Sequence, residues 1–163
     1  MEENALIDLT NLQQVLQEYA REAEEMYKYQ LSLGGKTASR KLIDSVKSNV
    51  VVGDQSYEVT LTLQDYWKYV EHGRKPGKFP PVGAILNWIS VKPIIPRPDA
   101  DGNIPSPKSL AYLIGRKIEQ EGIEPHPALK TTQEELMKIY RERLSAALGH
   151  DVENYIRKLI APE

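Results

Sequence analysis

The hydrophobic period of this chain changes from a helical repeat to a strand repeat, and that change restricts the fold more than any other feature. Between Leu9 and Met26, apolar residues recur at alternating steps of three and four, which is typical of one face of a helix. Between Val46 and Leu63, apolar and polar residues alternate on either side of the letters GDQ, which predicts two antiparallel strands joined by a turn. Helical patterns return after Leu63. The sequence therefore predicts an α+β fold.

The predicted sheet is small and consists of this antiparallel β-hairpin. The residues predicted to form its buried face are Val50, Val52, Val59 and Leu61. A two-stranded hairpin is only marginally stable by itself in water. We therefore expect several helices to pack against it, and its outer edges to be open to pairing with a neighbouring chain.

The chain has 163 residues, a length that usually forms one domain, so we expect residues 1–163 to be a single unit. Its expected parts are a long N-terminal helix, an α+β core and a C-terminal extension of two helices, at residues 1–35, 36–130 and 131–163. Thr10 and Gln13 have the spacing of a capping box for the first helix. The two C-terminal helices are expected to separate near Leu148.

Composition excludes several classes of protein. The chain has no cysteine, so disulfides, thiol nucleophiles and thiolate metal sites are excluded. The start is acidic and no apolar run reaches about 18 residues, so we expect no signal peptide and no membrane span, and a protein that is made and used in a cytoplasm. The formal net charge of −2 excludes a global basic field that would bind nucleic acid.

Charge is nevertheless uneven along the chain. Residues 1–33 carry a net charge of −5, whereas residues 36–47 and 68–78 each carry +3. Such polarity is common on proteins that stack against neighbours. Solvated faces without a partner explain the pattern equally well.

Glu71 and His72 raise the question of catalysis, because they precede a glycine and a basic cluster. Adjacent residues of a helix point about 100° apart, so the pair is a poor acid-base dyad. Neither His72 nor His126 nor His150 has the spacing of a metal site, and no GxSxG elbow occurs. The letters GGKT lack the earlier glycine of a phosphate loop, because position 30 is Gln30. We predict no enzyme activity, no metal and no cofactor.

The segment after Glu71 is predicted to be an exposed docking loop. Gly73 and Gly77 permit unusual backbone shapes, Pro76 stiffens the chain, and the loop's cations have no acidic partner within it. The predicted contact residues are Glu71, His72, Gly73, Arg74, Lys75, Lys78 and Phe79. Their partner is expected to be a neighbouring subunit, an adjoining protein or DNA.

The same basic loop also suits contact with phosphate, and Tyr66, Trp67 and Tyr69 nearby are residue types that stack on bases. These aromatic residues, however, fall on the helical face that we expect in the core. A small nucleic-acid-binding adaptor that uses residues 72–79 is therefore the alternative function. An uncharacterised hydrolase ranks third.

The order of motifs resembles the tail-completion, or head-tail joining, proteins of tailed bacteriophages. The matching stretches cover residues 30 to 130 and read LGGKTASRKLIDSV, YWKYVEHGRKPGKFPP, AILNWI, LAYLIGRKIEQEG and PHPAL. No one motif is specific, but their order matches that of the family. The chain departs from the family pattern at His72, at Arg74 where threonine is usual, and in its C-terminal extension.

The resemblance implies a structural virion protein of the phage neck or tail, made in the cytoplasm of a bacterial host and without catalytic residues. It implies a closed ring of about six or twelve copies around the DNA channel. The implied partners are a portal or adaptor protein on one side and tail-tube or other neck proteins on the other. Non-specific contact with genomic DNA is a further implied interaction, and no membrane is involved.

Overall fold

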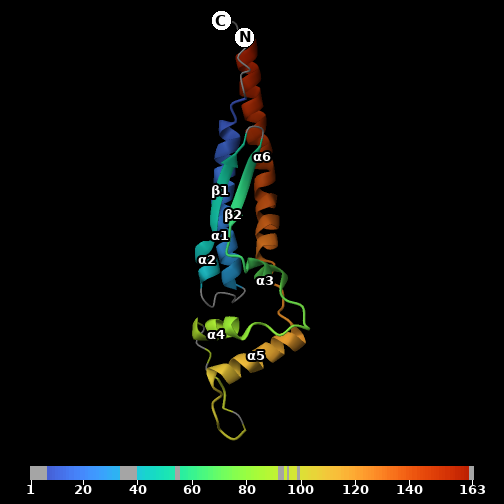
Figure 1. Ribbon diagram of the computed structural model, residues 1–163. Coiled ribbons are helices and arrows are strands. Elements are labelled where there is room, and N and C mark those ends of the chain that lie inside the picture. The colour runs from blue at the N-terminus through green and yellow to red at the C-terminus, as the bar shows by residue number, and fades with distance from the viewer. Residues whose placement is uncertain are drawn as a thin grey trace. The chain divides into compact units, whose positions relative to one another are not determined.

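The computed structural model describes residues 7–33, 40–53, 56–91, 94, 96–98 and 100–161, and it confirms the α+β class (Figure 1). Its elements in chain order are α1 (Thr10–Leu33), α2 (Lys41–Ser45), β1 (Lys47–Val52), β2 (Tyr57–Thr62), α3 (Trp67–His72), α4 (Val82–Val91), α5 (Pro107–Glu121) and α6 (Ala128–Ile160). Within the described residues, no helix is long and apolar enough to cross a membrane.

These elements form two compact units. The first unit contains Met1–Gln30, Val46–Thr62 and Leu129–Glu163, and the second contains Leu31–Ser45 and Leu63–Ala128. The hairpin therefore belongs with the first and last helices. This grouping differs from the expected one, which placed the hairpin in one core with the segments that follow it.

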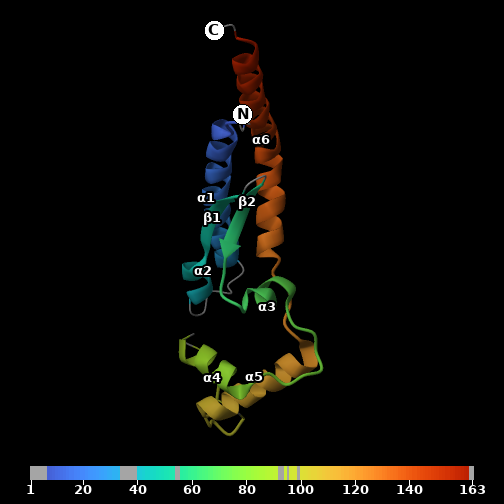
Figure 2. The ribbon, with the colours of Figure 1, turned by 45° about the horizontal axis from the view of Figure 1, so that its top comes forward.

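The core of the first unit lies between α1 and α6, which run side by side in opposite directions (Figures 1 and 2). Ala23 of α1 and Leu136 and Tyr140 of α6 are buried together. The ring of Tyr19 meets that of Tyr140 edge to face, with centroids 5.3 Å apart. Ala20 and Tyr27 of α1 are also buried in this unit.

The prediction of two C-terminal helices is wrong, because α6 is continuous from Ala128 to Ile160. Gly149 does not end it, since a glycine in a helix interior costs only about 1 kcal/mol relative to alanine. Ala147 before it and Asp151 after it are both buried, which holds the helix on either side of the glycine.

The hairpin has the register that alternation predicts. Val50 pairs with Val59, and the strands close toward the turn through a Gly53 N–H to Ser56 carbonyl hydrogen bond of 2.8 Å. Val50, Val59 and Leu61 are only half-buried, however, and the fully buried residue is Val46, just before β1. The predicted burial of Val52 is wrong: it is 53% exposed, because it ends β1 beside the turn.

In the second unit, α4 and α5 pack on each other. Ser106 caps α5 by accepting a hydrogen bond from the Ser109 N–H at 3.2 Å. Gly122 stands at the C-terminal end of α5 with a φ of +78°. This end of α5 supports the loop that follows α3.

Candidate functional site

The predicted docking loop starts at the end of α3 and is joined to the segment after α5 by backbone pairing. The Arg74 N–H donates to the Ile123 carbonyl at 2.9 Å, and the Ile123 N–H donates back to the Arg74 carbonyl at 2.8 Å. Gly73 makes this approach possible, because a Cβ there would lie 2.2 Å from the Ile123 carbonyl oxygen. Gly122 has the same role on the opposite segment, because an added Cβ there would lie 2.3 Å from the Arg74 carbonyl oxygen.

The far end of the loop is fastened to α5. The Gly77 N–H donates to the carbonyl of Glu119 at 2.7 Å. The Phe79 ring lies against Gly115, where an added Cβ would come within 2.4 Å of the ring. The centroid of the Phe79 ring is 5.5 Å from that of the Tyr112 ring. Two backbone attachments and one aromatic anchor therefore hold the loop in one conformation.

The predicted contact residues divide by burial. His72, Lys75 and Lys78 are exposed, as predicted. Gly73, Arg74 and Phe79 are half-buried, so the prediction that the whole loop from His72 to Phe79 is exposed is wrong for these three. The reason is that Phe79 anchors the loop on α5 and the Arg74 guanidinium donates to the Lys78 carbonyl at 3.1 Å within the loop.

Glu71 and Gly73, the other two contact residues, lie further in. Glu71 is only 6% exposed, whereas its neighbour His72 is exposed and its ring lies 6.2 Å from that of Trp67. Gly73 is half-buried against the segment after α5. Glu71 and His72 therefore occupy different surroundings, and the geometry provides no shared site for acid-base chemistry.

The aromatic residues of α3 do not lie where the sequence places them. Tyr69 is 61% exposed and Tyr66, just before the helix, is 38% exposed, so their predicted core position is wrong. Trp67 and Val70 are half-buried, and the Val70 carbonyl accepts a hydrogen bond from the His126 N–H at 2.8 Å. A helix of six residues can cover only one narrow face, and the two tyrosines fall outside it.

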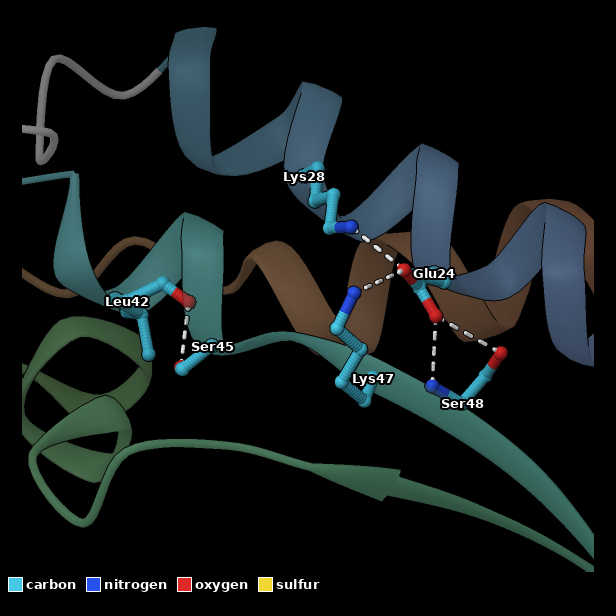
Figure 3. Close-up of polar contacts among 6 residues, drawn as sticks. All are labelled: Glu24, Lys28, Leu42, Ser45, Lys47 and Ser48. Atoms are coloured by element: carbon cyan, nitrogen blue, oxygen red, sulfur yellow. Dashed lines mark hydrogen bonds and ion pairs between the residues drawn. The ribbon is translucent and has the colours of Figure 1, made fainter.

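Sequence reasoning missed Glu24, which joins α1 to the outer edge of β1 (Figure 3). Its carboxylate accepts hydrogen bonds from Lys28 Nζ at 2.6 Å and from the N–H and hydroxyl of Ser48 at 2.7 and 3.1 Å. The Lys28 hydrogen bond lowers the pKa of Glu24 to about 2, against the opposing effect of burial and with help from Ser48. This contact occupies one backbone donor on the edge of the hairpin, which we had expected to be open.

Asp151 is the second residue that sequence reasoning missed. From α6 it accepts hydrogen bonds from the N–H groups of Asn11 and Leu12 at 3.2 and 2.8 Å, and so caps α1 from 140 positions away. Burial raises the pKa of Asp151, but these hydrogen bonds outweigh burial and place the pKa below its usual range. The predicted capping box is wrong: the Thr10 hydroxyl donates to Asp8, and the Gln13 N–H donates to the Leu9 carbonyl.

No other arrangement in the described residues points to chemistry. A shallow groove between α1 and α6 contains Arg143 and His150, but Arg143 already pairs with Glu18 across the groove. Within the part of the chain that is described, no group of three histidine, aspartate or glutamate side chains is placed to hold a metal ion.

Comparisons with models of protein families, with curated proteins and with solved structures find no match to this chain. The resemblance to phage neck proteins therefore depends on the order of sequence motifs alone.

Proposed function

We propose that the protein is a structural component of a tailed-bacteriophage virion that forms a homomeric ring in the neck or tail and joins the portal-capped head to the tail. The ring surrounds the DNA channel, and its neighbours are a portal or adaptor protein and tail-tube or other neck proteins. The motif order suggests this role, and the distribution of charge over the two units is the observation that supports it best.

The two units carry opposite charge. The second unit contains twelve lysines and arginines against eight aspartates and glutamates, a net charge of +4. The first unit contains nine basic against fifteen acidic residues, a net charge of −6. A ring with cyclic symmetry uses head-to-tail interfaces, in which two different surfaces of the same chain meet. Opposite charges on the two units suit such an interface and disfavour contact between like surfaces.

The docking loop provides a second supporting feature. Lys75 and Lys78 are exposed on a loop whose backbone is fixed by Ile123 and Glu119. A fixed loop loses little conformational entropy when it binds, so it is well suited to a repeated contact in an assembly.

The experiment measures the mass of the purified chain by light scattering at low and high salt. We expect a closed oligomer at low salt that dissociates as ionic strength rises, because exposed charge pairs are screened. Electron microscopy of the oligomer then tests for a ring, and particle assembly with the candidate phage components tests the joining of heads to tails.

The matched variants are Lys75→Ser with Lys78→Ser, and as control Lys108→Ser with Arg116→Ser, which removes two exposed basic residues of the same unit elsewhere. We expect the first pair to weaken assembly more than the second. A chain that stays monomeric at every salt concentration, and that does not enter particles, would contradict the proposed function.

A further inference from the structure

We infer that the exposed side of α3 and the docking loop form a binding surface for the phosphate backbone of nucleic acid, without sequence readout. This α3 surface consists of Tyr66, Lys68, Tyr69, His72, Lys75 and Lys78, all of which are exposed. The inference concerns the isolated chain and does not depend on ring formation.

The α3 surface presents hydrogen-bond donors and no exposed acid. From Tyr66 to Lys78 the only carboxylate belongs to Glu71, and that side chain is buried. Three ammonium groups and two phenol hydroxyls remain at the surface, and these are groups that contact phosphate oxygens in protein–DNA complexes.

Both tyrosines of the α3 surface are exposed. Nothing in the described part of the chain covers Tyr69, which is 61% exposed. An aromatic ring in water beside lysines is the arrangement that single-strand binders use, in which bases stack on rings while cations contact the backbone. A protein partner with an acidic surface would use the lysines but would leave the tyrosines unexplained.

The lysines of the docking loop are held in place. Backbone bonds to Ile123 and Glu119 fix the loop, and the Arg74 guanidinium donates a hydrogen bond to the Lys78 carbonyl within it. The lysines therefore project from a rigid backbone. A rigid surface pays a smaller ordering penalty on binding than a flexible tail of the same charge.

Acidic groups border the α3 surface and limit its strength. Asp65 precedes it, Glu124 lies beside Gly73 on the adjoining segment, and both are exposed. Glu121 is already paired with Lys117. Because the carboxylate of Glu124 repels phosphate, Glu124→Gln is expected to raise the affinity for DNA. The lysine substitutions are expected to lower it.

The experiment measures fluorescence anisotropy of labelled DNA with the full chain over a series of salt concentrations. One probe is a duplex of about 20 base pairs, and the other is a single strand of the same length, longer than the roughly 4–16 nucleotides that single-strand modules cover. For the duplex, Lys75→Ser with Lys78→Ser is expected to reduce the slope of log affinity against log salt by about 2, since each lost phosphate contact removes about 0.9. The Lys108→Ser, Arg116→Ser control is expected to keep the slope.

Substitutions of Tyr69 distinguish base stacking on a single strand from contact with the duplex backbone. If bases stack on its ring, Tyr69→Ala weakens single-strand binding by about 5- to 150-fold while Tyr69→Phe does not. If only its hydroxyl contacts phosphate, the two substitutions have the same small effect on both probes, and the surface is a duplex-backbone site. Absence of DNA binding at low salt, or equal losses in the lysine pair and its control, would overturn the inference while leaving the ring proposal intact.

Discussion

The contacts inside the first unit differ in kind from those inside the second. In the first unit, segments far apart in sequence are joined by carboxylates that accept hydrogen bonds from backbone N–H groups, as Glu24 does from Ser48 and Asp151 from Leu12. In the second unit, the loop after α3 is joined by backbone to backbone, between Arg74 and Ile123. The first kind of contact responds to protonation, and the second depends on glycines that let main chains approach. The two units should therefore fail under different changes.

The largest expected effect is on the second unit. Gly73→Ala places a Cβ 2.2 Å from the Ile123 carbonyl oxygen at a φ of +67°, so strain and overlap together should destabilise the unit by about 3 kcal/mol or more. Hydrogen exchange should show lost protection at the amides of Arg74 and Ile123. Protection at Ser48, in the first unit, should not change.

Gly77→Ala is the matched control for that substitution. Gly77 also has a positive φ, of +107°, but an added Cβ there meets nothing within 4 Å. Its effect should be limited to backbone strain of about 1 kcal/mol. Equal effects of the two substitutions would show that the close approach to Ile123 is not what holds the loop.

The next effect is the acid sensitivity of the first unit. The pKa of Glu24 is lowered from 4.5 to about 2, so its contribution is complete above the unfolded value and is lost as pH falls from about 5 to 2. The contribution at neutral pH should be about 2 to 3 kcal/mol. Glu24→Gln should remove most of it and flatten the pH profile of unfolding in that window. Glu25→Gln, at the exposed neighbouring position, should leave the pH profile unchanged. A flattened profile in Glu25→Gln would show that the acid sensitivity does not come from the contacts of Glu24.

The smallest expected effect is at the cap of α1. Asp151→Ala removes the acceptor for the N–H groups of Asn11 and Leu12 and should destabilise the first unit by about 1 to 2 kcal/mol. Chemical denaturation followed by circular dichroism measures the change. Asn154→Ala, at an exposed position one turn further along α6, should change stability by less than about 0.5 kcal/mol. If the two variants unfold alike, the cap contributes nothing.

The parts of the fold that follow from local pattern were predictable. Alternation identified the hairpin and placed Val50 and Val59 on the same face, and these two residues pair in the structure. The grouping of elements into units was not predictable, because it depends on contacts such as Asp151 to Leu12 that leave no trace in local sequence. A glutamate or aspartate on a helix looks the same whether it faces solvent or a distant N–H.

The candidate site was predicted only in part. The glycines and the proline indicated a stiff turn with exposed lysines, and Lys75 and Lys78 are indeed exposed. The sequence could not show that Arg74 and Phe79 are half-buried, because Phe79 packs on α5 and Arg74 bonds to the Lys78 carbonyl within the loop. Tyr69 was misplaced because a six-residue helix has too few positions for periodicity to define a buried face.

The cap on α1 by Asp151 also affects the order in which the two units fold during synthesis. The first unit needs residues from both ends of the polypeptide, whereas the second, apart from Leu31–Ser45, is the continuous segment Leu63–Ala128. Because domains generally fold as their residues emerge during synthesis, we expect the inner unit to form on the ribosome and the first helix to wait for its partner. A chain truncated after Ala128 lacks Leu136, Tyr140 and Asp151, and hydrogen exchange should then show a protected inner unit and an unprotected α1. Translation that stops there would yield a product whose acidic residues belong to an unfolded unit and present no fixed surface to an assembly.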